Sequence, residues 1–201
     1  TDDYYPALMR ENVQLVTEGI DRVLPEGIRT RDGVLHEADV IIFGTGFHSQ
    51  AFQGNLKVTG LNGADLKKRW ANGPEAYLGM TVEGFPNLFM VYGPNTNLNH
   101  NSILTMLEIQ QRYILQAIQA LQRVPGAAVS VRPEILTQFN NQLQEEMQDS
   151  AFSSDCSSWY KNTAGKVINN WSGTVEEYRQ LAGTWNEDDY LLHRVKEAFL
   201  S

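Results

Sequence analysis

The stretch EADVIIFGTGFHSQ, residues 37–50, joins a continuous apolar run, Val40–Phe43, to Gly44-Thr45-Gly46. The apolar run predicts a strand that is buried on both faces. A dinucleotide fingerprint requires G-x-G-x-x-G at a strand-to-helix turn, where backbone amides and the helix dipole meet a pyrophosphate. Here Ser49 stands at the third glycine position and no clear helix follows, so the standard fingerprint fails. The residues alone leave open both a nucleotide contact and a tight turn after a core strand.

The composition is that of an ordinary globular chain: 201 residues, of which 42% are hydrophobic and 20% charged. The formal net charge of −8 argues against nucleic-acid binding, which needs clustered Lys and Arg. No apolar run approaches the roughly 18 residues of a membrane span. A single cysteine, Cys156, favours a cytoplasmic location. The first residues, TDDYYPAL, have neither an initiator methionine nor a signal-peptide pattern, so we expect a fragment of a longer protein.

The first half of the chain predicts short strands and a long loop. Residues 12–43 are expected to form successive strands, with Asp32-Gly33 as a hairpin turn. Residues 47–86 are rich in Gly and Asn and predict loops with short strands; loops of this length are usually functional. A second buried strand is expected at residues 88–92, LFMVY, where Gly93-Pro94 ends it.

The second half predicts two main helices. The first begins at Ser102 and carries apolar residues at helical spacing: Ile103, Leu107, Ile114, Ile118 and Leu121. Pro125-Gly126 ends it, and AVSVR, residues 128–132, predicts a strand. The next helix carries Leu136, Phe139, Leu143 and Met147. Residues 151–173 resemble a hairpin with two exposed tryptophans or a tryptophan-lined cover, and residues 175–200 predict one or two short helices.

The polar loop before the first helix, Asn95–Asn101, is the second candidate ligand site. Free N–H groups at a helix start point outward, and the helix dipole favours partial negative charge there. Asn101 or Ser102 could simply cap the helix. Capping does not explain asparagines at positions 95, 97, 99 and 101, so we favour ligand binding. His100 could act as an acid–base group, although a structural role is more common.

Other chemistries lack the residues that they need. His36, His48 and His193 are scattered, so with one cysteine there is no metal-ligand spacing and no metal is expected. The sequence contains no G-x-S-x-G elbow and no P-loop. Glu145-Glu146 is interpreted as a solvated helix face. The tryptophans are interpreted as core or packing residues: Trp70, Trp159, Trp171 and Trp185.

Several segments resemble the class B flavoprotein monooxygenases, the family of Baeyer–Villiger and flavin-containing monooxygenases. ADVIIFGTGF, residues 38–47, resembles the segment in which that family's chain returns from the NADPH domain to the FAD domain. GPEAYLGMTVEGFPNLFMVYGPNTNLNHNSI, residues 73–103, is similar to the carboxyl-terminal part of the family's FAD domain. TDDYYPAL and CSSWYKNTAGKVINNWSG, residues 156–173, resemble the Baeyer–Villiger branch. The resemblance covers nearly the whole chain, in the family's order and spacing.

The resemblance implies an α/β fold: the carboxyl-terminal portion of a flavoprotein with two dinucleotide-binding domains, with strands, long central loops and two main helices. Residues 1–38 would be the strand-rich tail of the NADPH-binding domain, 39–126 the carboxyl-terminal part of the FAD-binding domain, and 127–201 an α+β extension. Gly44 stands where the family usually has alanine, which we expect to be tolerated. No catalytic residue is assigned. The residues implied to lie near FAD are Thr45, Gly46, Phe47, Asn95, Thr96, Asn97, Asn99, His100, Asn101 and Ser102.

Other parts of the family's pattern are absent from this sequence. It has neither glycine fingerprint, for FAD or for NADPH, and it lacks the Baeyer–Villiger fingerprint and the arginine that supports the peroxyflavin. The chain therefore resembles the last two-fifths of an enzyme in which NADPH reduces FAD and the reduced flavin takes up O2 as a C4a-peroxide. That enzyme would insert oxygen beside a ketone, or oxidise an amine or sulfide. The isolated chain is expected to be inactive, and to form a homodimer or leave disordered segments in the long loop.

Two alternatives remain from the sequence. The chain could be a stand-alone binding or interaction domain that kept the fold without the chemistry, and the sequence upstream of Thr1 would distinguish this from the enzyme. A relative of the pyridine-nucleotide-disulfide reductases is a weaker interpretation. Those enzymes typically have an Asp after the Gly of the last flavin strand, where this chain has Gly93-Pro94.

Overall fold

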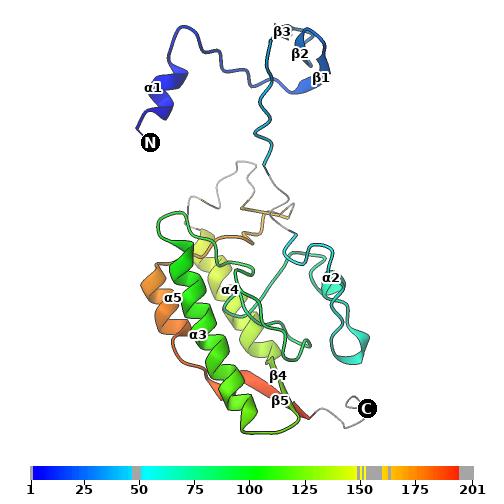
Figure 1. Ribbon diagram of the computed structural model, residues 1–201, viewed down its shortest axis with the longest axis vertical. Helices are drawn as coiled ribbons and strands as arrows, with labels where there is room; N and C mark the ends of the chain where they lie inside the picture. Colours follow the sequence, from blue (N-terminus) through cyan, green and yellow to red (C-terminus); the bar gives the residue numbers. More distant parts are fainter. Residues whose placement is uncertain are drawn as a thin grey trace. The chain divides into compact units, whose positions relative to one another are not determined.

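The computed structural model describes residues 2–46, 51–148, 150, 152, 160–162 and 164–194. The chain forms two compact units, Thr1–Phe47 and His48–Ser201 (Figure 1). The larger unit contains the long helices and most of the buried side chains.

The first unit is a short helix followed by an antiparallel three-stranded sheet. α1 (Tyr4–Leu8) precedes β1 (Ile20–Leu24), β2 (Gly27–Thr30) and β3 (Leu35–Glu37), which pair in the order β1-β2-β3. The predicted turn at Asp32-Gly33 is confirmed: Gly33 has a φ of +87°, and Asp32 Oδ1 accepts the Val34 N–H at 3.2 Å. The side-chain hydrogen bond fixes the turn that joins β2 to β3.

The strand predicted at Val40–Phe43 is wrong for this unit. These residues adopt no regular structure, and Val40, Ile42 and Phe43 are 76%, 90% and 74% exposed. Residues 12–19 also form no strand. A buried strand needs a neighbour for its backbone groups and cover for both faces, and the described part of this unit provides neither beside Val40–Phe43. An apolar run is therefore not sufficient for a buried strand.

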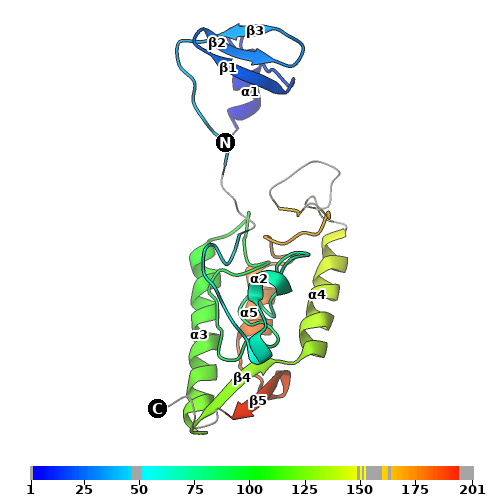
Figure 2. The same ribbon diagram turned by 90° about the vertical axis from the view of Figure 1, so that its right-hand side faces the viewer.

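The second unit is built on two long helices, as predicted. α3 (Ile103–Gln122) begins directly after Ser102, and α4 (Pro133–Gln148) follows β4 (Ala127–Val131). The tail contains α5 (Val175–Ala182), a 3-10 helix η3 (Glu187–Asp189) and β5 (Tyr190–Arg194). α3 packs against α5 and β4 (Figures 1 and 2). The predicted helix in the tail is confirmed, whereas β5 was missed.

β5 is a strand because β4 supplies a partner. The two strands pair antiparallel from Ala127–Arg194 to Val131–Tyr190. The predicted strand at residues 128–132 thus corresponds to β4. The sequence YLLHR, residues 190–194, is too short for its hydrophobic period to distinguish a strand from a helix. Pairing with β4, and not the local pattern, therefore sets its conformation.

The main core lies between α3, α4, α5 and β4. Its fully buried members include Met80, Met106, Tyr113, Leu136 and Tyr178. A smaller cluster around Leu66, Trp70 and Phe85 covers the region that contains η1 (Leu61–Gly63) and α2 (Leu66–Arg69). In folded proteins, packing of the apolar face supplies most of the stability of helices such as α3 and α4.

The tryptophans behave as core residues wherever the structure describes them. Trp70 and Trp171 are buried, and Trp185 packs against the main core, which confirms the packing interpretation. The alternative of two exposed tryptophans in residues 151–173 is wrong for Trp171, which is 5% exposed. Trp159 lies outside the described residues. The expected hairpin is limited here to an antiparallel bridge between Lys161 and Val167.

The strand predicted at Leu88–Tyr92 is also absent. The N–H groups of Leu88, Met90 and Tyr92 donate to Phe85 O, Met80 O and Gln110 Oε1, at 3.2, 2.9 and 2.9 Å. The intervening N–H groups of Phe89 and Val91 have no acceptor among the described residues. The segment is therefore bonded on one side only, which is the pattern of an unpaired sheet edge.

Among its described residues, the larger unit combines two long helices, a two-stranded sheet and long central loops. That mixture agrees with the fold class expected from the resemblance. The helix starts and ends follow local signals, whereas the missing strands lack neighbours. No described helix is both long enough and apolar enough to cross a membrane.

Candidate functional site

The first part of the loop Gly93–Ser102 runs beside residues 167–171 and is bonded to them through Asn95 and Asn97. Asn95 and Asn97 donate their backbone N–H groups to Ile168 O and Asn169 O, each at 2.9 Å. Trp171 returns its N–H to Asn97 O at 3.0 Å. The loop is therefore held like a strand, although it contains no regular strand, and its position is fixed by the core behind it.

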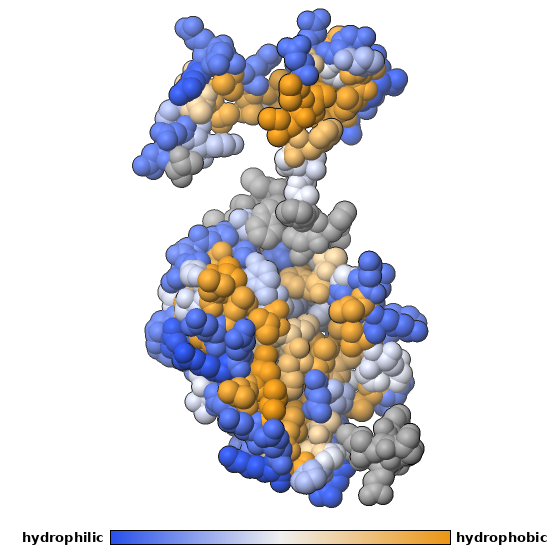
Figure 3. All heavy atoms as spheres, in the orientation of Figure 1, coloured by the Kyte–Doolittle hydropathy of each residue, from blue (hydrophilic) through white to orange (hydrophobic). Residues whose placement is uncertain are grey.

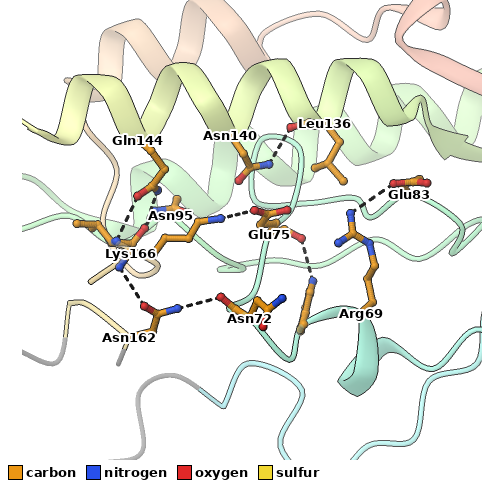
Figure 4. Close-up of polar contacts among 12 residues, drawn as sticks. Arg69, Asn72, Glu75, Glu83, Asn95, Leu136, Asn140, Gln144, Asn162 and Lys166 are labelled. Atoms are coloured by element: carbon orange, nitrogen blue, oxygen red, sulfur yellow. Dashed lines mark hydrogen bonds and ion pairs between the residues drawn. The ribbon is translucent and has the colours of Figure 1, made fainter. Parts of the chain in front are cut away.

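The supporting segment is itself anchored on two sides (Figure 4). On one side, Lys166 forms an ion pair with Glu75, and Asn162 Nδ2 donates to Asn72 O at 3.0 Å. On the other, Gln144 of α4 donates Nε2 to Val167 O at 2.8 Å. Because both anchors come from distant parts of the chain, the loop cannot form before the tertiary fold.

Asn95 and Thr96 are buried and bond inward. Asn95 has a φ of +57°, and its Nδ2 donates to Val167 O at 2.9 Å and to Asn170 O at 3.0 Å. The Thr96 hydroxyl donates to Gly93 O at 2.8 Å. Asn tolerates the left-handed conformation better than most residues do. These two side chains shape the loop, and the Asn95 Nδ2 and Thr96 hydroxyl donors are already used by the chain.

The next asparagines also have partners within the chain. The Oδ1 of Asn97 accepts the Tyr92 hydroxyl at 2.8 Å, and its Nδ2 donates to Asn170 Oδ1 at 3.2 Å. Asn99 Nδ2 donates to the Tyr160 hydroxyl at 3.0 Å. The structure thus gives these asparagines a role that the sequence did not suggest, because Asn170 lies 73 residues from Asn97 and Tyr160 lies 61 residues from Asn99.

His100, Asn101 and Ser102 form the exposed end of the loop. Asn101 Oδ1 accepts the Ser102 N–H at 2.7 Å, and the Ser102 hydroxyl makes no capping hydrogen bond. His100 lies at the edge of an open depression of about 740 Å³ that also includes Glu146 and Thr174. The end of the loop therefore exposes an imidazole, an amide and a hydroxyl.

The amino terminus of α3 lies at this exposed end and is left open. The backbone N–H groups of Ile103 and Leu104 have no acceptor among the described residues. A helix of 20 residues carries about half a positive charge at such an end. Open amides and this dipole together suit an electron-rich oxygen or nitrogen of a ligand.

Two buried features behind the loop were missed from the sequence. Gln110 of α3 is fully buried, accepts the Tyr92 N–H at 2.9 Å and donates to the Tyr178 hydroxyl at 3.0 Å. That hydroxyl donates to Leu78 O at 2.6 Å, and burial raises the Tyr178 pKa. The only sequence signal was a glutamine between Ile109 and Tyr113 on the apolar face of the helix.

The second missed feature is a close backbone contact at Gly79. Its φ is +66°, and a Cβ there would lie 2.1 Å from Thr96 Cγ2 and 2.8 Å from Pro94 O. A Cβ at Gly93 would lie 2.2 Å from Gly79 O. The turn at residues 77–80 and the start of the loop therefore approach more closely than side chains allow.

Gly44, Thr45 and Gly46 lie at the end of the first unit and are exposed. Gly46 has a φ of +76°. An alanine at Gly44 would meet no atom within 4 Å, so the difference from the family pattern carries no steric cost here. Phe47 lies outside the described residues. Within those residues, no group of three or more His, Cys, Asp or Glu side chains could hold a metal ion.

Comparisons with known proteins place this geometry in a family context. No protein-family model matches the chain. The FAD-binding monooxygenase ktnD of Aspergillus niger is 39% identical over 197 residues, which are 96% of this chain and 32% of that protein. A Baeyer–Villiger monooxygenase of Pseudomonas aeruginosa is 38% identical over 201 residues, or 99% of this chain and 38% of the relative.

The chain is homologous to a carboxyl-terminal part of the Baeyer–Villiger monooxygenases. It spans about a third of the length of the curated relatives that it matches. Among solved structures, an oxidized steroid monooxygenase bound to NADP is similar over 96% of this chain and 38% of the steroid monooxygenase chain. The TM-score is 0.74 and the sequence identity is 28%. A closed cyclohexanone monooxygenase covers the same shares with a TM-score of 0.73 and 29% identity. The fold class expected from the resemblance is thereby confirmed.

Proposed function

We propose that this chain forms part of an FAD- and NADPH-dependent monooxygenase, which inserts one oxygen atom of O2 into a small organic substrate. The observation that supports this most directly is the amino terminus of α3, where backbone N–H groups lack an acceptor among the described residues at the end of a loop that is hydrogen-bonded to the core. The names of the relatives, FAD-binding and Baeyer–Villiger monooxygenases, supply the cofactor and the reaction class.

The chain's own residues would hold one side of the flavin. The N–H groups of Ile103 and Leu104 would donate to a polar edge of the ring, and His100, Asn101 and Ser102 would line that edge. Asn95, Thr96, Asn97 and Asn99 would set the shape of the loop. Thr45, Gly46 and Phe47 would add a second contact with FAD. Bound flavin would supply the oxygen chemistry, while the protein supplies position and electrostatics.

Three further assignments belong to the same proposal. Residues 1–38 are the end of an NADPH-binding domain, 39–126 part of the FAD-binding domain, and 127–201 an extension. The single cysteine supports a cytoplasmic location.

Apolar side chains exposed along α3, those of Leu104, Leu115 and Ile118, support self-association of the isolated chain, which light scattering would measure (Figure 3).

A chimaera tests the proposed function. This chain replaces the aligned segment of the Pseudomonas aeruginosa Baeyer–Villiger monooxygenase, to which it is 38% identical. We expect the purified chimaera to retain FAD and to oxidise NADPH in the presence of a ketone, an amine or a sulfide. A folded chimaera that stays colourless contradicts the proposal, because this segment would then be unable to complete the flavin site.

A matched pair of variants in the chimaera tests the α3 contact. Ile103→Pro removes one open N–H at the first helical position, where proline is tolerated. The backbone of Ser102, with φ −71° and ψ 124°, suits a following proline. Ile103→Ala loses a similar amount of side chain but keeps the N–H. We expect Ile103→Pro to bind FAD about tenfold more weakly than Ile103→Ala, the loss of one hydrogen bond. Equal affinities would contradict this contact.

The isolated chain should behave differently from the chimaera. After incubation with FAD and desalting, we expect its visible spectrum to show no flavin, because the glycine fingerprints are absent from the sequence. We also expect no NADPH oxidation above that of free FAD. Retained yellow flavin would mean that the loop and α3 suffice, and that the site is not incomplete.

A further inference from the structure

A row of aromatic rings leads from the candidate loop into the core of the second unit. It begins at Trp171, whose backbone N–H donates to Asn97 O. Phe139 stacks on Trp171 with centroids 6.4 Å apart and an interplanar angle of 12°, and Tyr77 lies 5.4 Å from Phe139. Tyr77 is 6.3 Å from Tyr190, which stacks on half-buried Trp185 at 3.9 Å.

Four of these five rings can be oxidised by one electron. Indoles and phenols lose electrons far more readily than a phenyl ring, so Phe139 serves only as a bridge between Trp171 and Tyr77. Short centroid separations between consecutive rings allow electrons to tunnel from one to the next. The row is therefore a continuous route between the loop and half-buried Trp185.

Tyr77 differs from the other phenols because it has a carboxylate as proton acceptor. Its hydroxyl donates to Asp189 Oδ2 at 2.8 Å, and Asp189 Oδ1 accepts from Asn186 Nδ2 at 2.9 Å. Burial, and then the contact with Asp189, raise the Tyr77 pKa. The phenol is thus neutral at physiological pH, and an electron leaves it readily only together with its proton.

The other phenols that contact the row lack a carboxylate partner among the described residues. Tyr178, whose ring lies 5.4 Å from that of Trp171, donates its hydroxyl to Leu78 O. The Tyr190 hydroxyl lies 3.1 Å from that of Tyr113 and 3.3 Å from that of Thr81. Neither partner can accept a proton near neutral pH. A hole that reaches the cluster is therefore most stable on Tyr77.

We propose that Trp171, Phe139 and Tyr77, with Asp189, carry oxidising equivalents away from the loop Asn95–Ser102 and hold them as a tyrosyl radical. The oxidant is a strong one-electron oxidant formed beside the loop, of the oxygen-radical class. Only this source rests on the proposed function. Packing accounts for the burial of the rings but does not require a carboxylate beside the Tyr77 hydroxyl.

The electrons and protons balance in three steps. The indole of Trp171 gives one electron to the oxidant, and Tyr77 then gives one electron to Trp171. The Tyr77 proton moves to Asp189 Oδ2, which leaves a neutral tyrosyl radical beside a carboxylic acid. A soluble one-electron reductant of the ascorbate or thiol class returns an electron through Trp185 and Tyr190, and Asp189 returns the proton.

A flash-quench experiment on the full chain tests the route without flavin. A ruthenium polypyridyl photo-oxidant is attached at Asn99→Cys, an exposed position in the loop. The parent also carries Cys156→Ser, so that one thiol is labelled, and Tyr92→Phe and Tyr160→Phe, so that the phenols near the label cannot intercept the hole. Transient absorption follows the indole and phenoxyl radicals, and Ru(III) supplies the oxidising equivalent.

Each variant has its own expected result. In the parent, the indole radical should decay as the phenoxyl radical appears, with a solvent deuterium isotope effect. Tyr77→Phe should abolish the phenoxyl signal. Asp189→Asn keeps a hydrogen-bond acceptor but not a base, so phenoxyl formation should slow at least about tenfold and lose its isotope effect. Trp70→Phe is the control, because Trp70 belongs to the separate smaller cluster, and it should match the parent.

Two outcomes would overturn the route. Phenoxyl formation at the parent's rate in Tyr77→Phe would place the radical elsewhere. An unchanged rate and isotope effect in Asp189→Asn would remove the proton acceptor from the scheme even if Tyr77→Phe failed to fold. Because ruthenium replaces the cofactor, either result is independent of whether the chain binds FAD in the chimaera.

Discussion

The absence of a Cβ atom at Gly79 allows the candidate loop to pack closely against the turn at residues 77–80. The position of Gly79 between Pro94 O and Thr96 Cγ2 leaves no room for a methyl group, and its positive φ disfavours any other residue. Gly84 has a similar φ, +77°, but a Cβ there meets no atom within 4 Å. A comparison of alanine substitutions at these two glycines therefore separates the energetic cost of backbone strain from the cost of a steric clash with the loop.

We predict that Gly79→Ala lowers the free energy of unfolding by about 2–4 kcal/mol, from strain and overpacking together. Gly84→Ala should cost only about 1 kcal/mol, from strain alone. Urea unfolding of both variants measures the difference. Equal losses would mean that the loop shifts freely away from residue 79, and that its packing against the turn contributes little.

Among the secondary-structure elements, helix α5 begins with a capping box formed by Thr174 and Glu177. The Thr174 hydroxyl accepts the Glu177 N–H at 3.2 Å, and Glu177 Oε2 accepts the Thr174 N–H. That backbone hydrogen bond, followed by the one from the Thr174 hydroxyl, lowers the Glu177 pKa. A lowered pKa in the folded state contributes stability above the ordinary carboxyl pKa, and this contribution is lost as pH falls through the lowered value.

Thr174→Ala should therefore destabilise the chain by about 1 kcal/mol near neutral pH, the usual cost of a lost cap. The difference from the parent should shrink as the solution is acidified. Thr137→Ala, at an exposed position within α4, is the matched control, and its effect should stay within about 0.5 kcal/mol. Thermal unfolding at neutral and acidic pH measures both. A pH-independent difference at residue 174 would contradict the role of Glu177.

For the whole molecule, the buried tyrosines set the alkaline limit of stability. Burial is the first cause that raises the pKa of Tyr190 to about 12, and it also raises the pKa values of Tyr77, Tyr113 and Tyr178. The unfolded phenols titrate near pH 10. Because the folded values are higher, the stability is fully present below about pH 10 and is lost as pH rises through the folded pKa values.

We therefore expect the free energy of unfolding to fall steeply between about pH 10 and 12. Phenolate absorbance of the buried tyrosines should appear together with loss of helical circular dichroism. Tyr190→Phe removes one of the titrating groups and should make the decline less steep. Ionisation of all four buried tyrosines while the helices remain intact would show that the core admits water or charge more easily than this packing allows.

The helices and the hairpin turn were predictable because their signals are local. The apolar spacing along α3 and α4, the proline and glycine after α3, and Asp32-Gly33 each act within a few residues. The loop from Asn95 to Ser102 could also be chosen from sequence, because a polar run ends at the start of an apolar helix. Its internal bonding could not, because the partners at residues 167–171 lie far along the chain.

By itself, the sequence determined where α3 starts, where the hairpin turns and which loop meets the amino end of α3, since backbone preferences and capping operate over single turns. Only the tertiary structure decided which apolar runs become strands, since a strand requires a neighbour for its hydrogen bonds. Val40–Phe43 and Leu88–Tyr92 have similar patterns to a true core strand and form none here. β5, with a weaker pattern, is a strand because β4 lies beside it.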